Sequence, residues 1–369
     1  MKRGCVPDWN EPVWLTNSVA GSQLAARKVP DACLMLARVL LRSAVATALA
    51  TAWIGVPISS ASASQSTAIL SVMGPVIRGD APDPSILVVG HTYYSFTTDS
   101  GVNNVPVYES TDLVHWQLVG DAMPVLPSWA EVGLSWSPSV TFAPGGGYRL
   151  FYDAYNGGSG MECIGRATAA SPLGPFVDTS STPFLCQPDF GGSIDASVFH
   201  QDGGDVLVWK SDRIAGIWAQ SLGSDDARVV GVRHLLLTPS ASWEGGVIEG
   251  PAMLQIGSTI TLWFSAGAWS GSSYSIGMVR CDSPLGPCDA KSAVQELKSR
   301  RALIGPGGPT FFDRHGTAEM AFSAWVGNGR EMYLASVGSD GQAVASSARS
   351  TTLTLPRRAA TVSSARASG

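Results

Sequence analysis

Charged side chains are scarce in this chain of 369 residues. Asp, Glu, Lys and Arg together make up 14% of it, and the formal net charge at pH 7 is −5. A nucleic-acid-binding domain calls for a strongly basic surface, so this composition argues against a nucleic-acid partner. The sequence also lacks any pattern typical of a long amphipathic helix, which favours β structure over α structure.

No apolar run reaches the roughly 18 residues that a membrane-spanning helix needs. The nearest candidate, 44–58, follows Arg38 and Arg42, is interrupted by Pro57, and leads into the small-residue motif Ala-Ser-Ala at 61–63. A basic flank, a short apolar stretch and a small-residue exit are together typical of a secretory signal.

The predicted signal peptide covers residues 35–63, so we expect a secreted, extracellular protein without a stable membrane span after cleavage. An uncleaved membrane anchor is the alternative interpretation. Residues 1–34 precede the signal as an N-terminal extension of uncertain role, and Met35 is a candidate translation start.

Cysteines are few, and they lack the Cys-x2-Cys pairs that zinc sites usually show. Of the six, two lie within residues 1–34, outside the predicted mature protein. The remaining four allow three pairings. We favour two local disulfides, because each would close a loop around a turn. The favoured pairs are Cys163–Cys186 and Cys281–Cys288.

Glycine, proline and tryptophan are plentiful, with 41, 23 and 12 residues, and 45% of the chain is hydrophobic. Short apolar segments recur along the chain, and each is followed by a glycine turn and a second apolar segment, which predicts β-hairpins. The first segments of these hairpins are 84–88, 138–142, 196–200, 251–255 and 309–313.

The hairpins recur at intervals of 54–58 residues, counted from the residue that precedes each one. A repeat of this length that holds about four strands is typical of a propeller blade. We therefore predict an all-β fold, a five-bladed β-propeller over residues 75–345, with a two-sheet sandwich as the alternative. The tail 346–369 is too poor in apolar residues to join the core.

Three acidic residues stand at the starts of blades one, three and four, namely Asp83, Asp195 and Glu249. Because the first strand of each blade lines the central channel, these carboxylates are expected to meet at one mouth. Clustered like charges raise at least one pKa, which is typical of a functional site. Taken singly, each acid is also explained as a turn residue or a strand-end cap.

The segments around these acids, 81–86, 193–197 and 248–251, resemble the three acidic motifs of glycoside hydrolase family 43. The segment 136–140 is similar to the Trp-Ala-Pro motif of its second blade. The family consists of five-bladed propellers and includes arabinanases, α-L-arabinofuranosidases and β-xylosidases. The likeness covers about residues 75–337, so it implies that the propeller is a single catalytic domain.

Matched by position, the resemblance implies that Asp83 is the general base, Glu249 the general acid and Asp195 the modulator of the pKa of the acid. The family inverts the anomeric centre, so Asp83 and Glu249 are expected roughly 6.5–9.5 Å apart, with a water between base and sugar. The expected function is hydrolysis of arabinose- or xylose-containing polysaccharides or oligosaccharides, by a monomer that requires no cofactor.

Several further residues are candidates for substrate binding, because sugar rings have apolar faces that pack on aromatic side chains. Any one tryptophan is equally well explained by core packing. The candidates are Trp136, Trp243, Trp269 and Arg213.

The resemblance fails at blade five, where the family often carries a His that helps to hold a central calcium. This chain has Gly308 there, which argues against a metal site, although carbonyl groups and waters could still bind calcium. A fructan-active retaining hydrolase is one alternative, but no Arg-Asp-Pro motif is present and Glu162-Cys163 falls late in its blade. A sugar-binding propeller without catalysis is the other alternative.

Overall fold

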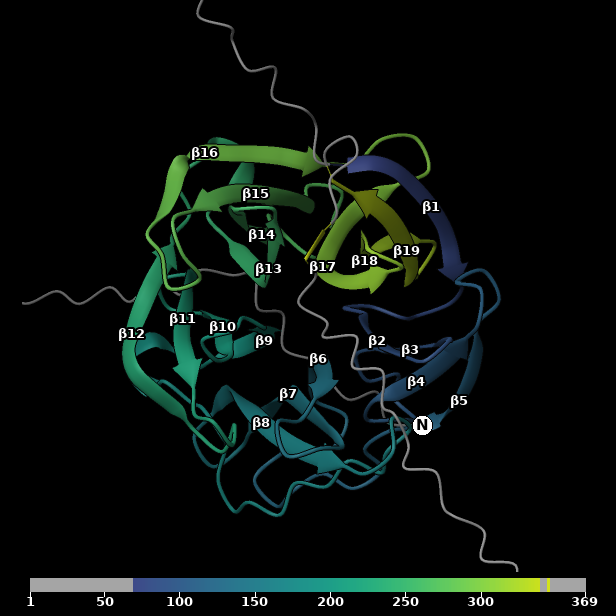
Figure 1. Ribbon diagram of the computed structural model, residues 1–369, viewed down its shortest axis with the longest axis vertical. Helices are drawn as coiled ribbons and strands as arrows, with labels where there is room; N and C mark the ends of the chain where they lie inside the picture. The colour runs from purple at the N-terminus through teal and green to yellow at the C-terminus, as the bar shows by residue number, and fades with distance from the viewer. Residues whose placement is uncertain (1–68, 339–343, 346–369) are drawn as a thin grey trace, which may run out of the picture. The chain divides into compact units, whose positions relative to one another are not determined.

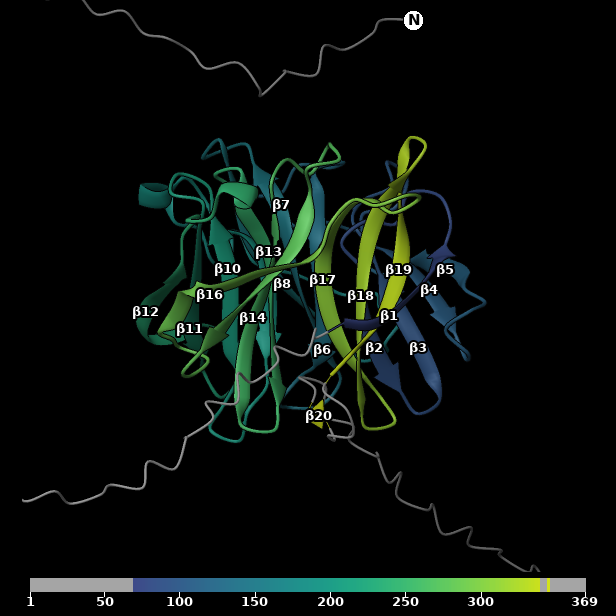
Figure 2. The same cartoon turned by 90° about the horizontal axis from the view of Figure 1, so that it is seen from above.

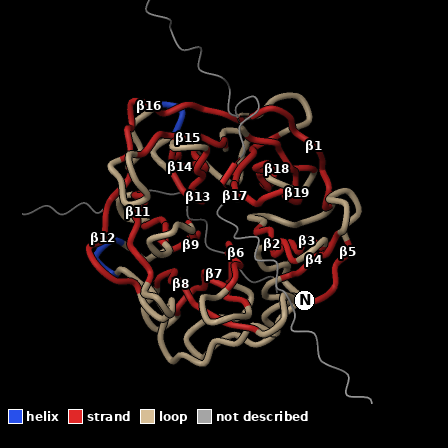
Figure 3. The backbone as a smooth tube through the Cα atoms, viewed as in Figure 1, coloured by secondary structure: helices blue, strands red, loops and turns tan. Residues whose placement is uncertain are grey.

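The computed structural model of the protein describes residues 69–338 and 344–345. These residues form five small β-sheets arranged in a ring, the five-bladed β-propeller that the repeat predicts (Figure 1). The rest of the described chain is loops and two single 3₁₀ turns, η1 (Pro188–Phe190) and η2 (Ser242–Glu244) (Figure 3). The predicted extension at 1–34, the signal peptide at 35–63 and the tail at 346–369 lie outside the described residues.

The blades follow one another in chain order, and their strands are antiparallel. Blade 1 contains β2 (Ser85–Val89), β3 (Thr92–Phe96), β4 (Pro106–Ser110) and β5 (Gln117–Asp121). Blade 2 contains β6 (Ser135–Phe142), β7 (Tyr148–Asn156) and β8 (Met161–Ala169). Blade 3 contains β9 (Ile194–Phe199), β10 (Val206–Ser211), β11 (Gly216–Leu222) and β12 (Val229–Leu237).

Blade 4 contains β13 (Ile248–Ile256), β14 (Thr259–Ala266), β15 (Ser275–Cys281) and β16 (Cys288–Leu297), with β20 (Val344–Ala345) paired to its inner strand. Blade 5 contains β17 (Ile304–Arg314), β18 (Thr317–Val326), β19 (Gly329–Val337) and, as its outer strand, β1 (Ile69–Ile77). The first described strand therefore completes the last blade and closes the ring. Hairpin patterns report only neighbours in sequence, so they did not predict this pairing, and β1 begins before residue 75.

Blade 2 has three strands where the repeat predicts about four. Two isolated bridges, Ile164 to Leu185 and Thr168 to Val177, stand in place of a continuous outer strand. The intervening segment contains Pro172, Pro175 and Pro183, and a proline nitrogen cannot donate to a strand ladder.

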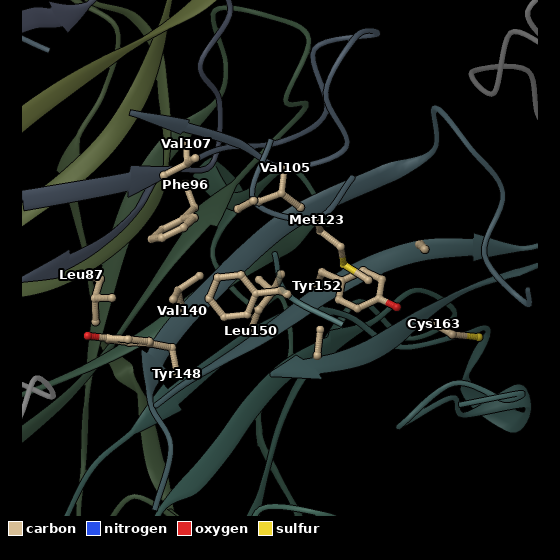
Figure 4. Close-up of a cluster of buried hydrophobic side chains, with 14 of the residues drawn as sticks. Leu87, Phe96, Val105, Val107, Met123, Val140, Tyr148, Leu150, Tyr152 and Cys163 are labelled. Carbon is tan, nitrogen blue, oxygen red and sulfur yellow. The ribbon is translucent and has the colours of Figure 1, made fainter. Parts of the chain in front are cut away.

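The core is divided among the seams between blades, with one buried apolar cluster at each of the five. At the seam of blades 1 and 2, Leu87 and Phe96 pack against Val140, Leu150 and Tyr152 (Figure 4). Because each blade is covered on both faces, its central strands are buried along most of their length, and all six residues of β10 are buried. This explains why the inner strands are continuous apolar runs rather than alternating ones.

The disulfides join the pairs that the sequence favoured. One links Cys163 in β8 to Cys186 in the loop before η1, and the other links Cys281 to Cys288, which face each other across β15 and β16. Both bonds lie within single blades, so they stabilise the outer parts of blades 2 and 4 rather than the ring closure.

The strands nearest the axis are β2, β6, β9, β13 and β17 (Figures 1 and 2). Side chains from all five line a central channel. All five begin at the same end of the channel, which is called the mouth below. The mouth holds the residues of the candidate site.

Candidate active site

One residue near the mouth end of each first strand adopts a left-handed backbone conformation. The φ angles are 51° at Asp83, 44° at Ser137, 59° at Asp195, 53° at Gly250 and 68° at Gly308. For a residue other than glycine this conformation costs about 1–3 kcal/mol, and such strain is concentrated at functional sites. Three of the five blades retain a strained polar residue here, which places its side chain against the neighbouring blade.

A second set of polar residues lies opposite these starts, at the mouth end of each second strand. This second-strand ring consists of Thr98, Asp153, Lys210, Ser265 and Ser323. Its members in blades 1, 2 and 4 accept the backbone N–H of the left-handed residue in the next blade. The distances are 3.1 Å from Ser137 to Thr98, 2.6 Å from Asp195 to Asp153 and 2.8 Å from Gly308 to Ser265. The two sets of residues thus join adjacent blades around the mouth.

Asp83 is held by a cation and a hydroxyl group. Arg330 donates to both of its carboxylate oxygens, at 3.1 and 2.8 Å, and Thr98 Oγ1 donates at 2.8 Å. Burial alone would lower the pKa of Arg330, but the interactions with Asp83, Tyr274 and Glu249 together outweigh it and hold that pKa above its ordinary value. A bidentate arginine stabilises and orients the ionised carboxylate, while 18% of the Asp83 side chain remains exposed.

Asp195 joins blades 2, 3 and 4. It accepts hydrogen bonds from Ser137 Oγ at 2.7 Å and from the Gly250 N–H at 2.9 Å. Burial, followed by the charge on Glu249, raises the pKa of Asp195 to about 6. Beneath it, burial raises the pKa of Asp153 well above its ordinary value, and the charge on Asp195 adds to this effect.

Glu249 lies one residue before the left-handed position of its blade, so it is not equivalent in register to Asp83 and Asp195. Its Oε2 accepts a hydrogen bond from Lys210 Nζ at 3.1 Å, and its Oε1 accepts one from the Tyr274 hydroxyl at 2.8 Å. Lys210 also pairs with Asp212, at 2.8 Å.

The three acids share one electrostatic environment. Burial raises the pKa of Tyr274 well above its ordinary value, and the charges on Glu249 and Asp83 both add to this shift. Burial also raises the pKa of Glu162 to about 7, with the charge on Asp212 as the next cause. The mouth therefore holds several carboxyl groups and two buried cations, Lys210 and Arg330, within electrostatic range of one another.

Two of the four candidate substrate-binding residues lie at this mouth. Trp269 is 54% exposed, stacks on Trp325 with ring centroids 6.2 Å apart, and lies under the Arg330 guanidinium at 5.6 Å. Trp136 is half-buried at the start of β6, where it pairs with Asp153 across the strands. The stacked Trp269 and Trp325 lie next to Arg330, the partner of Asp83, and the exposed part of Trp269 suits the face of a sugar ring.

The other two candidates have structural partners. Trp243 stacks on Phe264 at 5.9 Å, and its ring packs so closely on Gly277 that no side chain fits at that position. Arg213 is exposed and donates to the Asp189 carbonyl at 2.9 Å, which ties its turn to η1. Trp243 is therefore explained by core packing.

Gly308 lies directly against Asp83. A Cβ atom at this position would approach Asp83 Oδ1 to 2.9 Å and the Asp83 Cα to 3.2 Å, and the backbone has a positive φ. A histidine therefore does not fit here without displacing Asp83. Within residues 69–338 and 344–345, no group of three or more His, Cys, Asp or Glu side chains is arranged to hold a metal ion.

Sequence reasoning missed Arg330, Thr98, Lys210 and Tyr274. Two of them carried a readable signal, because Thr98 and Lys210 are polar residues at the ends of apolar second strands and recur at the blade interval. Arg330 follows a glycine turn in β19 and Tyr274 lies in a loop, so only the folded ring reveals that they face the acids.

The chain matches a known protein family. The family described as Glycosyl hydrolases family 43 matches residues 72–341. The solved structure titled "Crystal structure of a thermostable family-43 glycoside hydrolase" superimposes with a TM-score of 0.65 at 26% identity, and the alignment covers 72% of this chain and 92% of that one.

The alignments with two curated relatives cover only part of each protein. A xylan 1,3-β-xylosidase from Vibrio sp is 28% identical over 205 residues, which are 50% of this chain and 36% of the relative. A non-reducing end α-L-arabinofuranosidase from Bacteroides ovatus is 30% identical over 222 residues, which are 58% of this chain and 39% of the relative. The chain thus spans less than half the length of these two proteins.

Proposed function

Because the chain belongs to glycosyl hydrolases family 43, we propose that it cleaves O-glycosidic bonds in arabinose- or xylose-containing polysaccharides with inversion of the anomeric centre. The observation that carries this proposal is the pair of carboxylates at one mouth, Asp83 and Glu249, which come from non-adjacent blades and have different partners. The relatives named as a xylosidase and an arabinofuranosidase support xylose and arabinose as the sugars of the substrate.

Asp83 acts as the general base. Arg330 and Thr98 hold its carboxylate in one orientation, which leaves a partly exposed oxygen edge for a water molecule. As the water oxygen bonds to the anomeric carbon, Asp83 accepts a proton from that water.

Glu249 acts as the general acid and gives its proton to the departing glycosidic oxygen as the bond to the anomeric carbon breaks. Asp195 modulates this step, because its negative charge disfavours a second anion beside it. The pKa of about 6 for Asp195 means that this charge is largely present at neutral pH.

Trp269 binds the face of a sugar ring next to Asp83, with Trp325 behind it. Trp136, at the same mouth on the blade 2 side, is a second candidate contact. No proposed step uses a metal ion or a redox cofactor, because the two carboxylates supply both proton transfers.

Secretion belongs to the same proposal. The signal-like sequence at 35–63 and the two disulfides support export to an oxidising compartment. In the described part of the chain, no helix has the length and apolar character needed to cross a membrane. Mass spectrometry of protein from the culture medium should give an N-terminus near residue 64, whereas an intact N-terminus would contradict signal cleavage.

Hydrolysis of aryl α-L-arabinofuranosides and aryl β-D-xylosides tests the activity directly. The parent should release the phenol from at least one of them, and Asp83→Asn and Glu249→Gln should lower the rate by about 100-fold or more on a substrate with a poor leaving group. Equal rates in parent and variants would refute the assigned roles. Binding without hydrolysis would instead favour the non-catalytic propeller.

A further inference from the structure

Lys210 is the exception within the second-strand ring. Its counterparts Thr98, Asp153 and Ser265 accept the N–H of the left-handed residue in the next blade, whereas an ammonium group has no lone pair to offer. At the seam of blades 3 and 4, the Gly250 N–H is bound instead by Asp195 Oδ2, at 2.9 Å. The hydrogen bond to the Gly250 N–H that joins blades 3 and 4 is therefore made without Lys210.

The ammonium group of Lys210 is directed at Glu249 instead. Nζ lies 3.1 Å from Glu249 Oε2 and 2.8 Å from Asp212 Oδ1, and only 8% of the residue is exposed. Burial alone would lower the pKa of Lys210, but the charges on Glu249, Asp212 and Asp195 outweigh it and hold that pKa above its ordinary value. Lys210 is therefore a permanent cation beside Glu249.

We infer that Lys210 is a positioning residue for the acid step, which fixes Glu249 Oε2 and stabilises the carboxylate that Glu249 becomes when its proton leaves. This inference rests on the proposed function. Tyr274, whose hydroxyl lies 2.8 Å from Oε1, fixes the other oxygen.

Lys210 transfers no proton in this step. The O–H bond of Glu249 breaks, its proton goes to the glycosidic oxygen, and the electron pair of the broken carbon–oxygen bond stays with the leaving group. Glu249 gains a full negative charge, and a cation at 3.1 Å stabilises that charge more in the transition state than in the ground state. The benefit is large when the leaving group is a poor one and small when it departs without a proton.

The pH dependence should change as well. The charged and titratable groups that face Glu249 are Lys210 from β10, Asp195 from β9, Glu162 from β8, Arg330 from β19 and Tyr274 from the loop before β15. Of the two cations, Lys210 is the one in hydrogen-bond contact. Its removal makes Glu249 harder to ionise, so the alkaline limb of kcat/KM should move to higher pH.

The test compares two aryl glycosides of the same sugar, one with a phenyl and one with a 2,4-dinitrophenyl leaving group. In Lys210→Met, kcat for the phenyl glycoside should fall by about 100-fold, whereas kcat for the dinitrophenyl glycoside should stay within about threefold of the parent. Lys210→Gln, which keeps polar contact without charge, should show the same pattern and serves if the methionine variant does not fold. Lys291→Met, an exposed lysine in β16, is the matched control and should behave as the parent.

Equal losses on both substrates, or no loss on either, would overturn the inference, and so would an alkaline limb that does not move. Glu249→Gln separates this failure from failure of the proposed function. If the parent is active and Glu249→Gln shows the leaving-group dependence while the Lys210 variants do not, only the role of Lys210 is wrong. If the parent cleaves neither substrate, the proposed function itself fails.

Discussion

Two buried arginines pair with carboxylates in this propeller, and they differ in what surrounds them. Arg330 binds Asp83 at the mouth, and its guanidinium lies 5.6 Å from the centroid of the Trp269 ring. Arg149 is fully buried between blades 2 and 3, where it pairs with Asp205 at 2.6 Å and with Asp226. Burial lowers the pKa of Arg149, whereas at Arg330 the interactions with Asp83, Tyr274 and Glu249 together outweigh burial and raise the pKa.

A buried ion pair does not by itself mark an active site. The Arg149 pair joins two blades, with Asp226 only 1% exposed and Asp205 also bound by His200 at 2.8 Å. The Arg330 pair leaves part of Asp83 open to the mouth and lies among other acids and an aromatic surface. We therefore expect variants of the first pair to affect stability and variants of the second to affect the reaction.

The largest effect is expected at Asp83. Asp83→Asn removes the base but keeps the side-chain volume and an oxygen that can accept from Arg330, so kcat should fall by about 1,000-fold with a smaller effect on the unfolding midpoint. Steady-state kinetics and thermal denaturation measure the two quantities. Asp205→Asn is the matched change in the other pair and should destabilise the fold with near-normal kcat; the opposite pattern would erase the distinction between the pairs.

Arg149→Met should lower the free energy of unfolding by about 3–5 kcal/mol, because it leaves Asp205 and Asp226 without their buried cation. Urea denaturation measures this loss, and kcat of the folded fraction should match the parent. Arg228→Met, an exposed arginine in the neighbouring loop, is the control and should be close to neutral. A loss below about 1 kcal/mol for Arg149→Met would mean that the buried pair contributes little.

Arg330→Lys tests whether the fork of two hydrogen bonds matters, since lysine keeps the charge but contacts Asp83 through a single nitrogen. We expect a fall in kcat of about 10- to 100-fold with a smaller change in stability than that of Arg149→Met. Kinetics and urea denaturation of the same preparation make this comparison. Parent-like kcat would show that charge alone is sufficient at this position.

The smallest effect concerns Glu162, whose pKa is about 7 in the folded protein against an ordinary value of 4.5. The folded state binds this proton more tightly, so the stability contribution of Glu162 is highest at low pH and decreases as the pH rises from about 4.5 to about 7. Glu162→Gln should therefore be more stable, relative to the parent, at pH 8 than at pH 5, by about 1–2 kcal/mol. Urea denaturation at both pH values measures this, and an equal difference at the two would refute it.

Much of the fold was predictable because blade hairpins are local in sequence. The five first strands and their glycine turns are adjacent segments, and their positions in the structure match the predicted ones. The pairing of β1 with β19 joins residues at opposite ends of the described chain, and no local pattern encodes it. The irregular outer edge of blade 2 was not predicted either. Its prolines interrupt the outer strand because they cannot donate the hydrogen bonds of a strand ladder, and the repeat pattern does not show this.

The candidate site was predictable at its first-strand positions and hidden elsewhere. Asp83 and Asp195 occupy the repeated start position, so their register was readable, and the structure brings both to the mouth together with Glu249. Arg330 and Lys210 come from third and second strands, where a lone cation in an apolar strand has many explanations. Their contacts with Asp83 and Glu249 exist only because the ring places different blades side by side.

In the proposed mechanism, Asp83 and Glu249 act from opposite faces of one glycosidic bond, with a water molecule as the direct nucleophile. Proton NMR of the sugar first released from an aryl glycoside, recorded before mutarotation, tests this most directly. We expect the first-formed sugar to have the anomeric configuration opposite to that of the substrate. Release of the sugar with the substrate's own configuration would contradict it.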